Sequence, residues 1–180
     1  RAALGWALAM GTSSLTKKYT WESGTLRPGD RLLVGAPYVK DADLVVVAVP
    51  VLKIAETIRQ AAPHLKPGCI VTDVGSVKAA VITEVGPLIP EGVHFVAGHP
   101  IAGTENSGAE AAFPELYIGR KCILTPTDKT NADALEKVRL IWEATGAEVV
   151  IMDSALHDAI LAAVSHLPHM IAYTLVNTVG

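Results

Sequence analysis

The residues best suited to chemistry lie in the stretch GHPIAGTENSG, residues 98–108. This stretch holds one histidine, His99, between Gly98 and Pro100, directly after the apolar run at 93–97. Glycine allows the backbone to approach a ligand closely and proline fixes one φ angle, so we expect His99 on a stiff turn just past a strand. An imidazole held there is suited to proton transfer near neutral pH, whereas a lone turn histidine usually only bonds to backbone.

Two further polar stretches accompany this histidine. DVGSVK, residues 73–78, joins a predicted strand to a predicted helix, and we expect Ser76 to cap that helix, whose free N–H groups favour an anion or a ribose hydroxyl. SHLPH, residues 165–169, places two histidines three apart on a helix, with His157 upstream. No third metal ligand lies at a recognisable spacing from these histidines, so we expect no metal site. His166 then either contacts a substrate or is a partly buried helix histidine without a role in the site. The absence of a G-x-S-x-G elbow disfavours a Ser/His/Asp hydrolase.

Apolar runs alternate with helical patterns over most of the chain, which predicts the elements that position these residues. The run at 43–49 is β-branched and apolar on both faces, which is typical of a buried parallel strand. We predict strands at 43–49, 69–72, 93–97, 121–125 and 147–152, and helices at 54–62, 77–85, 130–145 and 154–179. The helix at 130–145 should begin with a capping box formed by Thr130 and Asp133 and should stop at Gly146. The helix at 154–179 should be kinked at Pro168.

This alternation predicts an α/β fold with a doubly wound, Rossmann-like, mostly parallel sheet. Ligands of such sheets bind outside the carboxyl ends of the strands. The loops at Pro50, 73–76 and 98–105 should therefore converge on one crevice.

Residues 1–38 lack this regularity. We expect a short apolar helix at 1–10, a loop at 11–30 and a short strand at 31–34. The chain begins with arginine rather than methionine, and the last predicted helix is still running at Gly180. We therefore expect a fragment, or a misread start, with the sheet incomplete at its N-terminus.

Composition excludes several other classes of protein. Half of the residues are hydrophobic, only 18% are charged, and the net charge is −3 with no basic block, so we expect no nucleic-acid partner. The longest uninterrupted apolar run, 44–52, is too short to span a membrane, and no signal-peptide pattern is present. We therefore expect a cytoplasmic protein with no membrane partner. Cys69 and Cys122 each sit in an apolar run and are interpreted as buried hydrophobes.

Four motifs together closely resemble the prephenate dehydrogenase family, in its order and spacing over about residues 40–180; they are DVGSVK at 73–78, GHPIAGTENSG at 98–108, GRKCILTPT at 119–127 and SHLPH at 165–169. The resemblance implies oxidative decarboxylation of prephenate to 4-hydroxyphenylpyruvate in tyrosine biosynthesis, with NAD or NADP as cofactor; the alternative substrate is arogenate. It also implies a dinucleotide-binding domain at 1–152 and the start of a helical domain at 153–180, through which the full-length protein forms a homodimer.

The resemblance also implies residue roles. His99 matches the catalytic histidine, which takes the proton of the substrate's ring hydroxyl as hydride leaves the same carbon. Ser76 matches a serine that supports this histidine near the nicotinamide, and no metal is required. The matching substrate-binding residues are Thr104, Glu105 and His166. The matching cofactor-binding residues are Val49, Pro50, Val74, Gly75, Ser76, Pro100 and Ile101.

Two departures from the family pattern limit these implications. The phosphate-binding pattern G-x-G-x-x-G is absent from the sequence, so we expect the chain as written to bind NAD(P) weakly and to be inactive. The family's arginine for a substrate carboxylate would lie beyond Gly180. The sequence leaves open prephenate or arogenate, NAD or NADP, and feedback by tyrosine. It also leaves open a non-catalytic relative that senses an aromatic metabolite, and another NAD(P) enzyme such as a hydroxyacid dehydrogenase.

Overall fold

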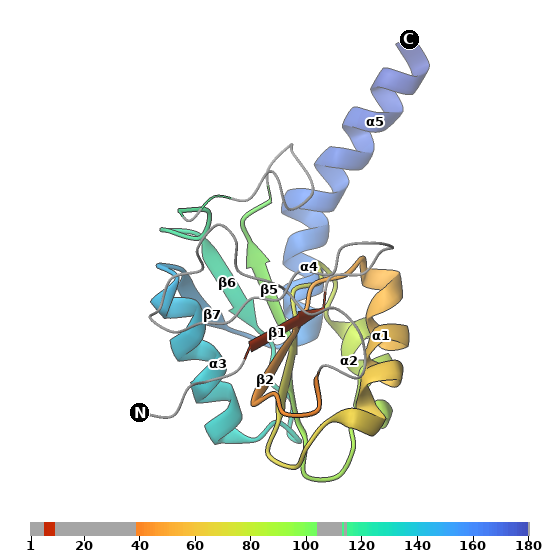
Figure 1. Cartoon of the computed structure of the whole chain (residues 1–180). Coiled ribbons are helices and arrows are strands. Elements are labelled where there is room, and N and C mark those ends of the chain that lie inside the picture. Colours follow the sequence, from red (N-terminus) through yellow and green to blue (C-terminus); the bar gives the residue numbers. More distant parts are fainter. Residues whose placement is uncertain (1–5, 10–38, 104–112, 114, 180) are drawn as a thin grey trace.

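The computed structural model of the chain describes residues 6–9, 39–103, 113 and 115–179 (Figure 1). The strands in these residues are β1 (Trp6–Ala9), β2 (Leu44–Val47), β3 (Ile70–Asp73), β4 (His94–Val96), β5 (Gly98–Ile101), β6 (Lys121–Leu124) and β7 (Glu148–Ile151). The α-helices are α1 (Ile54–Ala61), α2 (Ala79–Val85), α3 (Ala132–Ala144), α4 (Ser154–Leu161) and α5 (Leu167–Val179). Short 3₁₀ turns, η2 (Val51–Lys53), η3 (Ala62–His64) and η4 (Gly86–Leu88), flank α1 and α2, and a π-helical segment, η6 (Ala162–His166), joins α4 to α5.

The strands form two hydrogen-bonded sheets. The first has the order β1-β2-β3-β4 and is parallel throughout, while in the second, β5-β6-β7, only β5 runs antiparallel to its neighbour. The backbone N–H of Thr125 donates to the carbonyl of Ala97, 3.0 Å away, and so links the two sheets at the single residue between β4 and β5. The α/β fold with a mostly parallel sheet is confirmed.

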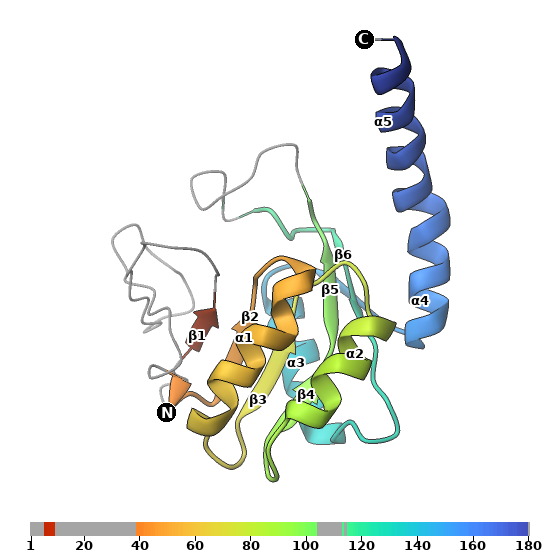
Figure 2. The same ribbon diagram turned by 90° about the vertical axis from the view of Figure 1, so that its right-hand side faces the viewer.

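Helices cover both faces of the first sheet, with α1 and α2 on one side and α3 on the other (Figures 1 and 2). Neighbouring residues of one strand therefore enter opposite cores: Val45 packs with Ile54 and Ile58 of α1, and Leu44 packs with Val138 of α3. Burial on both faces explains why these strands are unbroken apolar runs rather than alternating ones.

Two predicted helix caps are wrong. Helix α2 begins at Ala79 and has Lys78 at the N-cap with no side-chain cap, so Ser76 does not cap it. Its first N–H groups, those of Lys78 and Ala79, instead donate to the carboxylate of Asp158, 80 and 79 residues away. In α3 the capping oxygen belongs to Asn131, which accepts from the N–H of Ala134, and not to the predicted Thr130. Long-range and neighbouring acceptors thus replaced the caps that the local pattern predicted.

Two segments adopt a different structure from the one predicted. Residues 98–101 form strand β5 rather than a turn, and His99 lies opposite Ile123 of β6. Pro100 is tolerated because β5 is the edge of its sheet, where a missing N–H costs no ladder bond. Residues 6–9 form a strand rather than part of a helix, because they pair in parallel with β2. The predicted loop at 11–30 and strand at 31–34 lie outside the described residues.

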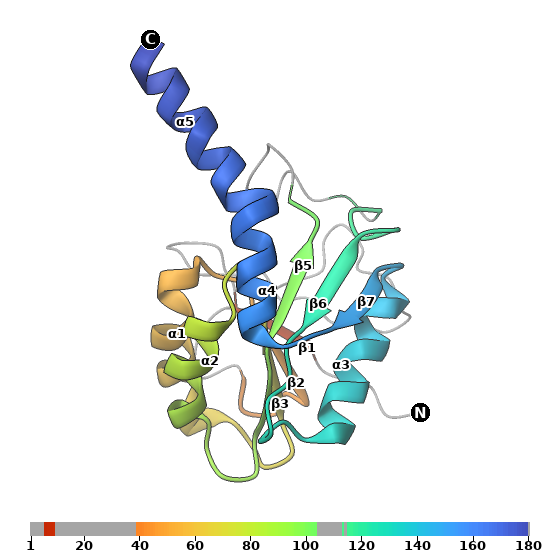
Figure 3. The same ribbon diagram turned by 180° about the vertical axis from the view of Figure 1, so that it is seen from behind.

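The C-terminal helical run is confirmed from Ser154 to Val179. The disturbance expected at Pro168 takes the form of the π-helical turn η6, which begins six residues before it. Helix α5 projects from the body of the molecule, and its large apolar residues are exposed (Figure 3). By length and composition this 26-residue helical run is also apolar enough to cross a membrane, although polar residues interrupt its sequence.

Candidate active site

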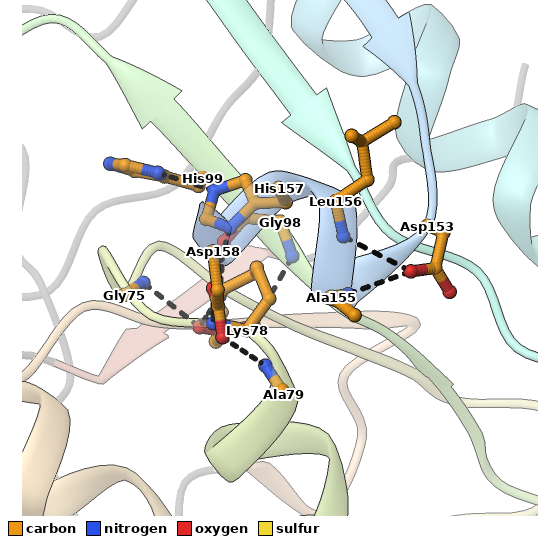
Figure 4. A network of polar contacts seen from close by, with 11 residues as sticks. Gly75, Lys78, Ala79, Gly98, His99, Asp153, Ala155, Leu156, His157 and Asp158 are labelled. Carbon is orange, nitrogen blue, oxygen red and sulfur yellow. Dashed lines mark hydrogen bonds and ion pairs between the residues drawn. The ribbon is translucent and has the colours of Figure 1, made fainter. Parts of the chain in front are cut away.

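A buried ion pair anchors the backbone that carries His99. The carboxylate of Asp73, at the end of β3, contacts the ammonium of Lys78 and accepts from the N–H groups of Gly75 at 2.8 Å and Gly98 at 3.2 Å. The ammonium of Lys78 also donates to the carbonyl of Gly98, 2.6 Å away (Figure 4). Both backbone polar groups of Gly98 are therefore held by one ion pair, and the next residue is His99.

The ion pair lies in a dry environment. The side chains of Asp73 and Lys78 are fully buried. Burial raises the pKa of the Asp73 carboxyl and lowers the pKa of the Lys78 ammonium, while the contact between the two groups opposes both shifts. The N–H donors of Gly75 and Gly98 further support the ionised carboxylate. A buried pair is tolerable only when its remaining bonding capacity is satisfied in this way.

Close packing explains two of the glycines around the pair. A Cβ on Gly75 would lie 2.8 Å from Cδ1 of Ile54 and 2.9 Å from Oδ2 of Asp73. A Cβ on Gly98 would lie 3.0 Å from the carbonyl oxygen of Asp73. The close approach that we expected Gly98 to allow is therefore an approach to β3.

The ring of His99 is the start of a chain of side-chain contacts. Its Nδ1 lies 2.9 Å from Nε2 of His157, and Nδ1 of His157 lies 2.7 Å from Oδ1 of Asp158 (Figure 4). Asp158 Oδ1 also accepts from the N–H of Lys78 at 2.8 Å, and its Oδ2 accepts from that of Ala79 at 2.9 Å. The chain of contacts therefore joins β5, α4 and the start of α2.

Electrostatics keep His99 neutral. Its exposed fraction is 8%, and burial is the largest cause that lowers the pKa of His99 to about 4. The ammonium of Lys78, and any proton held by His157 or His166, lower this pKa further, and the Asp158 carboxylate opposes them. At neutral pH the imidazole therefore carries no net charge and has one ring nitrogen free to accept a proton.

Asp158 remains an anion. Partial burial raises the pKa of its carboxyl, but the hydrogen bonds from the N–H groups of Lys78 and Ala79 and from His157 outweigh burial and hold this pKa below its usual value. An ionised carboxylate acts only as an acceptor. Asp158 therefore serves both as a distant cap for α2 and as the partner of His157.

The structure places the other predicted cofactor residues at the carboxyl ends of the strands. Val49 and Pro50 follow β2, Val74, Gly75 and Ser76 follow β3, and Pro100 and Ile101 lie on β5. The two loops are adjacent, because a Cβ on Gly75 would lie 3.4 Å from Cγ2 of Val51. The predicted convergence of the Pro50 and 73–76 loops is thus observed.

The predicted substrate residues are only partly described. His166 is half-buried in η6, and its charge contributes to the pKa of His99. Thr104 and Glu105 lie outside the described residues. No hydrogen bond joins Ser76 to His99 in the described part of the chain, where the imidazole contacts His157 instead. Within residues 6–9, 39–103, 113 and 115–179, no three His, Cys, Asp or Glu side chains are grouped to hold a metal.

Sequence reasoning missed His157 and Asp158 as parts of this site. One local signal existed: His157 lies on the buried side of α4, four residues before the buried Leu161. A polar ring that shares the buried face of an amphipathic helix needs a hydrogen-bond partner. The sequence carries no indication that this partner is His99, 58 residues away.

Comparisons with known proteins agree with this architecture. The family model described as "Prephenate dehydrogenase, nucleotide-binding domain" matches residues 33–151, and the model described as "Prephenate dehydrogenase, dimerization domain" matches residues 153–180. A cyclohexadienyl dehydrogenase of Zymomonas mobilis is 42% identical over 142 residues, which cover 79% of this chain and 48% of that protein.

Two solved structures resemble the chain closely. The prephenate dehydrogenase of Aquifex aeolicus, in complex with hydroxyphenyl propionate and NAD⁺, is 42% identical with a TM-score of 0.72, over 76% of this chain and 47% of that one. The arogenate dehydrogenase of Synechocystis is 33% identical with a TM-score of 0.72, over 79% of this chain and 50% of that one. The chain spans about half the length of these relatives.

Proposed function

The chain belongs to the prephenate dehydrogenase family, and from that premise we propose that the protein catalyses the NAD(P)-dependent oxidative decarboxylation of prephenate to 4-hydroxyphenylpyruvate in tyrosine biosynthesis. The second candidate substrate is arogenate, which the likeness to the Synechocystis arogenate dehydrogenase favours. His99 is the general base, and Ser76 assists it from the loop after β3.

One observation carries this proposal: His99 is buried and neutral, and its Nδ1 is already engaged by His157. Only Nε2 remains to accept the proton of a ring hydroxyl. As this proton moves to Nε2, hydride leaves the carbon that bears the hydroxyl. The chemistry that NAD(P)⁺ supplies when bound is acceptance of that hydride. The ring carboxylate then leaves as CO₂, the electrons of its bond to the ring pass through the ring to the newly formed carbonyl oxygen, and this oxygen takes up a proton from His99 Nε2 to give the aromatic phenol. General bases of this kind contribute about 10²–10⁴-fold to the rate.

The residues at the strand ends fit the nicotinamide half of the cofactor. Pro50 is exposed, Val74 is half-buried and Ile101 has an exposed fraction of 37%, so apolar surface is left uncovered where the strands end. A flat ring with an amide suits such a surface, as ligand sites are mostly apolar with few polar groups. The other proposed contacts are Val49, Gly75, Ser76 and Pro100.

On the substrate side we assign Thr104, Glu105 and His166. Of these, His166 supports the assignment by its position, since it is half-buried and its charge acts on His99. Thr104 and Glu105 are assigned because, within the stretch 98–108, they match substrate-binding residues of the family.

For the assembly we propose a nucleotide-binding domain at 1–152 and a helical domain that begins at 153 and forms a homodimer in the cytoplasm. The family description of residues 153–180 as a dimerization domain supports this. So does the apolar surface that the helical run leaves exposed at Val164, Leu167, Met170, Ile171, Tyr173, Leu175, Val176 and Val179. Burial of this surface against a second subunit accounts for its composition without a membrane.

The test is a steady-state assay of the protein encoded by the complete gene. Prephenate and arogenate are each supplied with NAD⁺ or NADP⁺, and reduced cofactor is followed by its absorbance while the product is identified by chromatography. We expect 4-hydroxyphenylpyruvate from prephenate, or tyrosine if arogenate is the substrate. If no pair of substrate and cofactor gives turnover, the proposed function is wrong.

A further inference from the structure

We propose that His157 and Asp158 are positioning residues that fix the tautomer of His99, so that its proton lies on Nδ1 and its lone pair on Nε2. This inference rests on the proposed role of His99 as the base. It adds two residues from α4 to a site whose other members belong to the sheet and its loops.

The hydrogen shared between His157 and Asp158 belongs to the histidine. Both carboxylate oxygens of Asp158 accept backbone N–H groups, those of Lys78 and Ala79. The carboxylate has no hydrogen to give, so the hydrogen in the 2.7 Å contact lies on Nδ1 of His157. Asp158 therefore determines the tautomer of His157.

The second step carries this tautomer to His99. In neutral His157 with its hydrogen on Nδ1, Nε2 has a lone pair and accepts a hydrogen bond. Its partner at 2.9 Å is Nδ1 of His99, which must therefore be the donor. Neutral His99 then has its lone pair on Nε2, the nitrogen that the proposed reaction uses. A histidine without this partner would favour the opposite tautomer, with hydrogen on Nε2, and could not accept the substrate proton there.

The surroundings make this chain of hydrogen bonds persistent. His157 is fully buried and His99 is nearly so, so water does not compete for either ring. Asp158 is itself fixed because it bridges the first two N–H groups of α2. Two adjacent hydrogen bonds in a region of low dielectric strengthen one another.

The location of these residues gives the chain a further consequence. His99 lies in the segment matched by the nucleotide-binding model, and His157 and Asp158 lie in the segment matched by the dimerization model. The reactive tautomer of the base therefore depends on the docking of α4 against α2 and β5. A change that loosens this contact should lower turnover although it touches neither cofactor nor substrate.

The experiment compares His157→Leu, His157→Gln and the wild type, as the complete gene product. Gln places an amide oxygen close to the position of Nε2 and so retains an acceptor for His99, whereas Leu retains volume only. His64→Leu is the matched control, because His64 is an exposed histidine at the end of η3, on the opposite end of α1 from the Pro50 loop. Thermal unfolding of each variant establishes that it is folded.

The direct readout is the tautomer of His99, measured by long-range ¹H–¹⁵N NMR of ¹⁵N-histidine-labelled protein. We expect hydrogen on Nδ1 in the wild type, in His157→Gln and in His64→Leu, and a shift toward hydrogen on Nε2 in His157→Leu. Hydrogen on Nε2 of His99 in the wild type would overturn the inference, because His157 would then be the donor to His99.

The kinetic readout separates positioning from stability. We expect His157→Leu to lower kcat and kcat/KM together by roughly 10²-fold, with His157→Gln recovering most of the loss. Equal losses in the Leu and Gln variants, with the His99 tautomer unchanged, would also overturn the inference. An inactive wild type with hydrogen on Nδ1 of His99 would instead refute the proposed function and leave the tautomer assignment intact.

Discussion

The buried ion pair between Asp73 and Lys78 permits a quantitative test by the substitution Lys78→Met. Methionine approximates the volume of lysine but leaves the carboxylate of Asp73 fully buried without its cation. Removal of one partner from a buried pair costs about 3–5 kcal/mol, because an uncompensated charge remains. The loss of the bond from Lys78 Nζ to the carbonyl of Gly98 adds to this cost.

The chain provides a matched control in Lys121→Met. Lys121 also contacts a carboxylate, that of Glu148, but the two side chains retain 56% and 59% of their exposure. An exposed pair contributes about 0–1 kcal/mol, since water screens the charges. The two substitutions therefore remove the same chemical contact and differ in burial.

The assay is urea and thermal unfolding followed by circular dichroism at pH 7. A loss of 3–5 kcal/mol corresponds to a decrease in Tm of about 6–20 °C for a chain of this size. The double variant Asp73→Leu/Lys78→Met should regain part of the stability, because no buried charge is left. If Lys78→Met costs no more stability than Lys121→Met, the ion pair does not hold the end of β3 against β5.

Three further outcomes are expected. The pKa of His99 is about 4 in the folded state and 6.5 in the unfolded state, so the unfolded state binds a proton more tightly. The free energy of unfolding should therefore fall by about 3 kcal/mol as the pH decreases from 6.5 to 4. Urea unfolding should show this loss in the wild type and not in His99→Asn. Gly75→Ala should lower Tm, since its Cβ would meet Ile54 and Asp73, whereas Gly86→Ala, with open space around it, should not; equal effects would contradict the packing argument. The 180-residue chain lacks a G-x-G-x-x-G loop, so its affinity for NADH and NADPH should be about two to four orders of magnitude lower than that of a complete site. Low-micromolar saturation in a fluorescence titration would instead show that residues 1–38 contain an unrecognised phosphate site.

The regular elements were predictable because they depend on local pattern. Strands β2, β3 and β6 are largely buried, and β4 and β7 are partly buried, so each is a short, mostly apolar run. The helices between them have apolar residues at helical spacing. The stop of α3 at Gly146 was also local, as this residue adopts a φ of 85° that favours glycine.

The features that the sequence did not reveal depend on partners far along the chain. Strand β5 contains Gly98 and Pro100, which locally favour a turn, and pairing with β6 overrides that preference. The cap of α2 comes from Asp158, 80 residues from Lys78. Recognition of His99 depended on its neighbours in sequence, whereas the contact with His157 that orients it exists only in the fold.

The central claim is that His99 is the general base, and turnover by His99→Asn in the complete gene product tests it most directly. Asparagine can still bond to His157 but cannot accept the substrate proton, so the fold and the binding of cofactor should persist. We predict a kcat lower by roughly 10²–10⁴-fold with prephenate or arogenate, whichever the wild type uses. A variant that binds cofactor normally and turns over at a near wild-type rate would contradict the account.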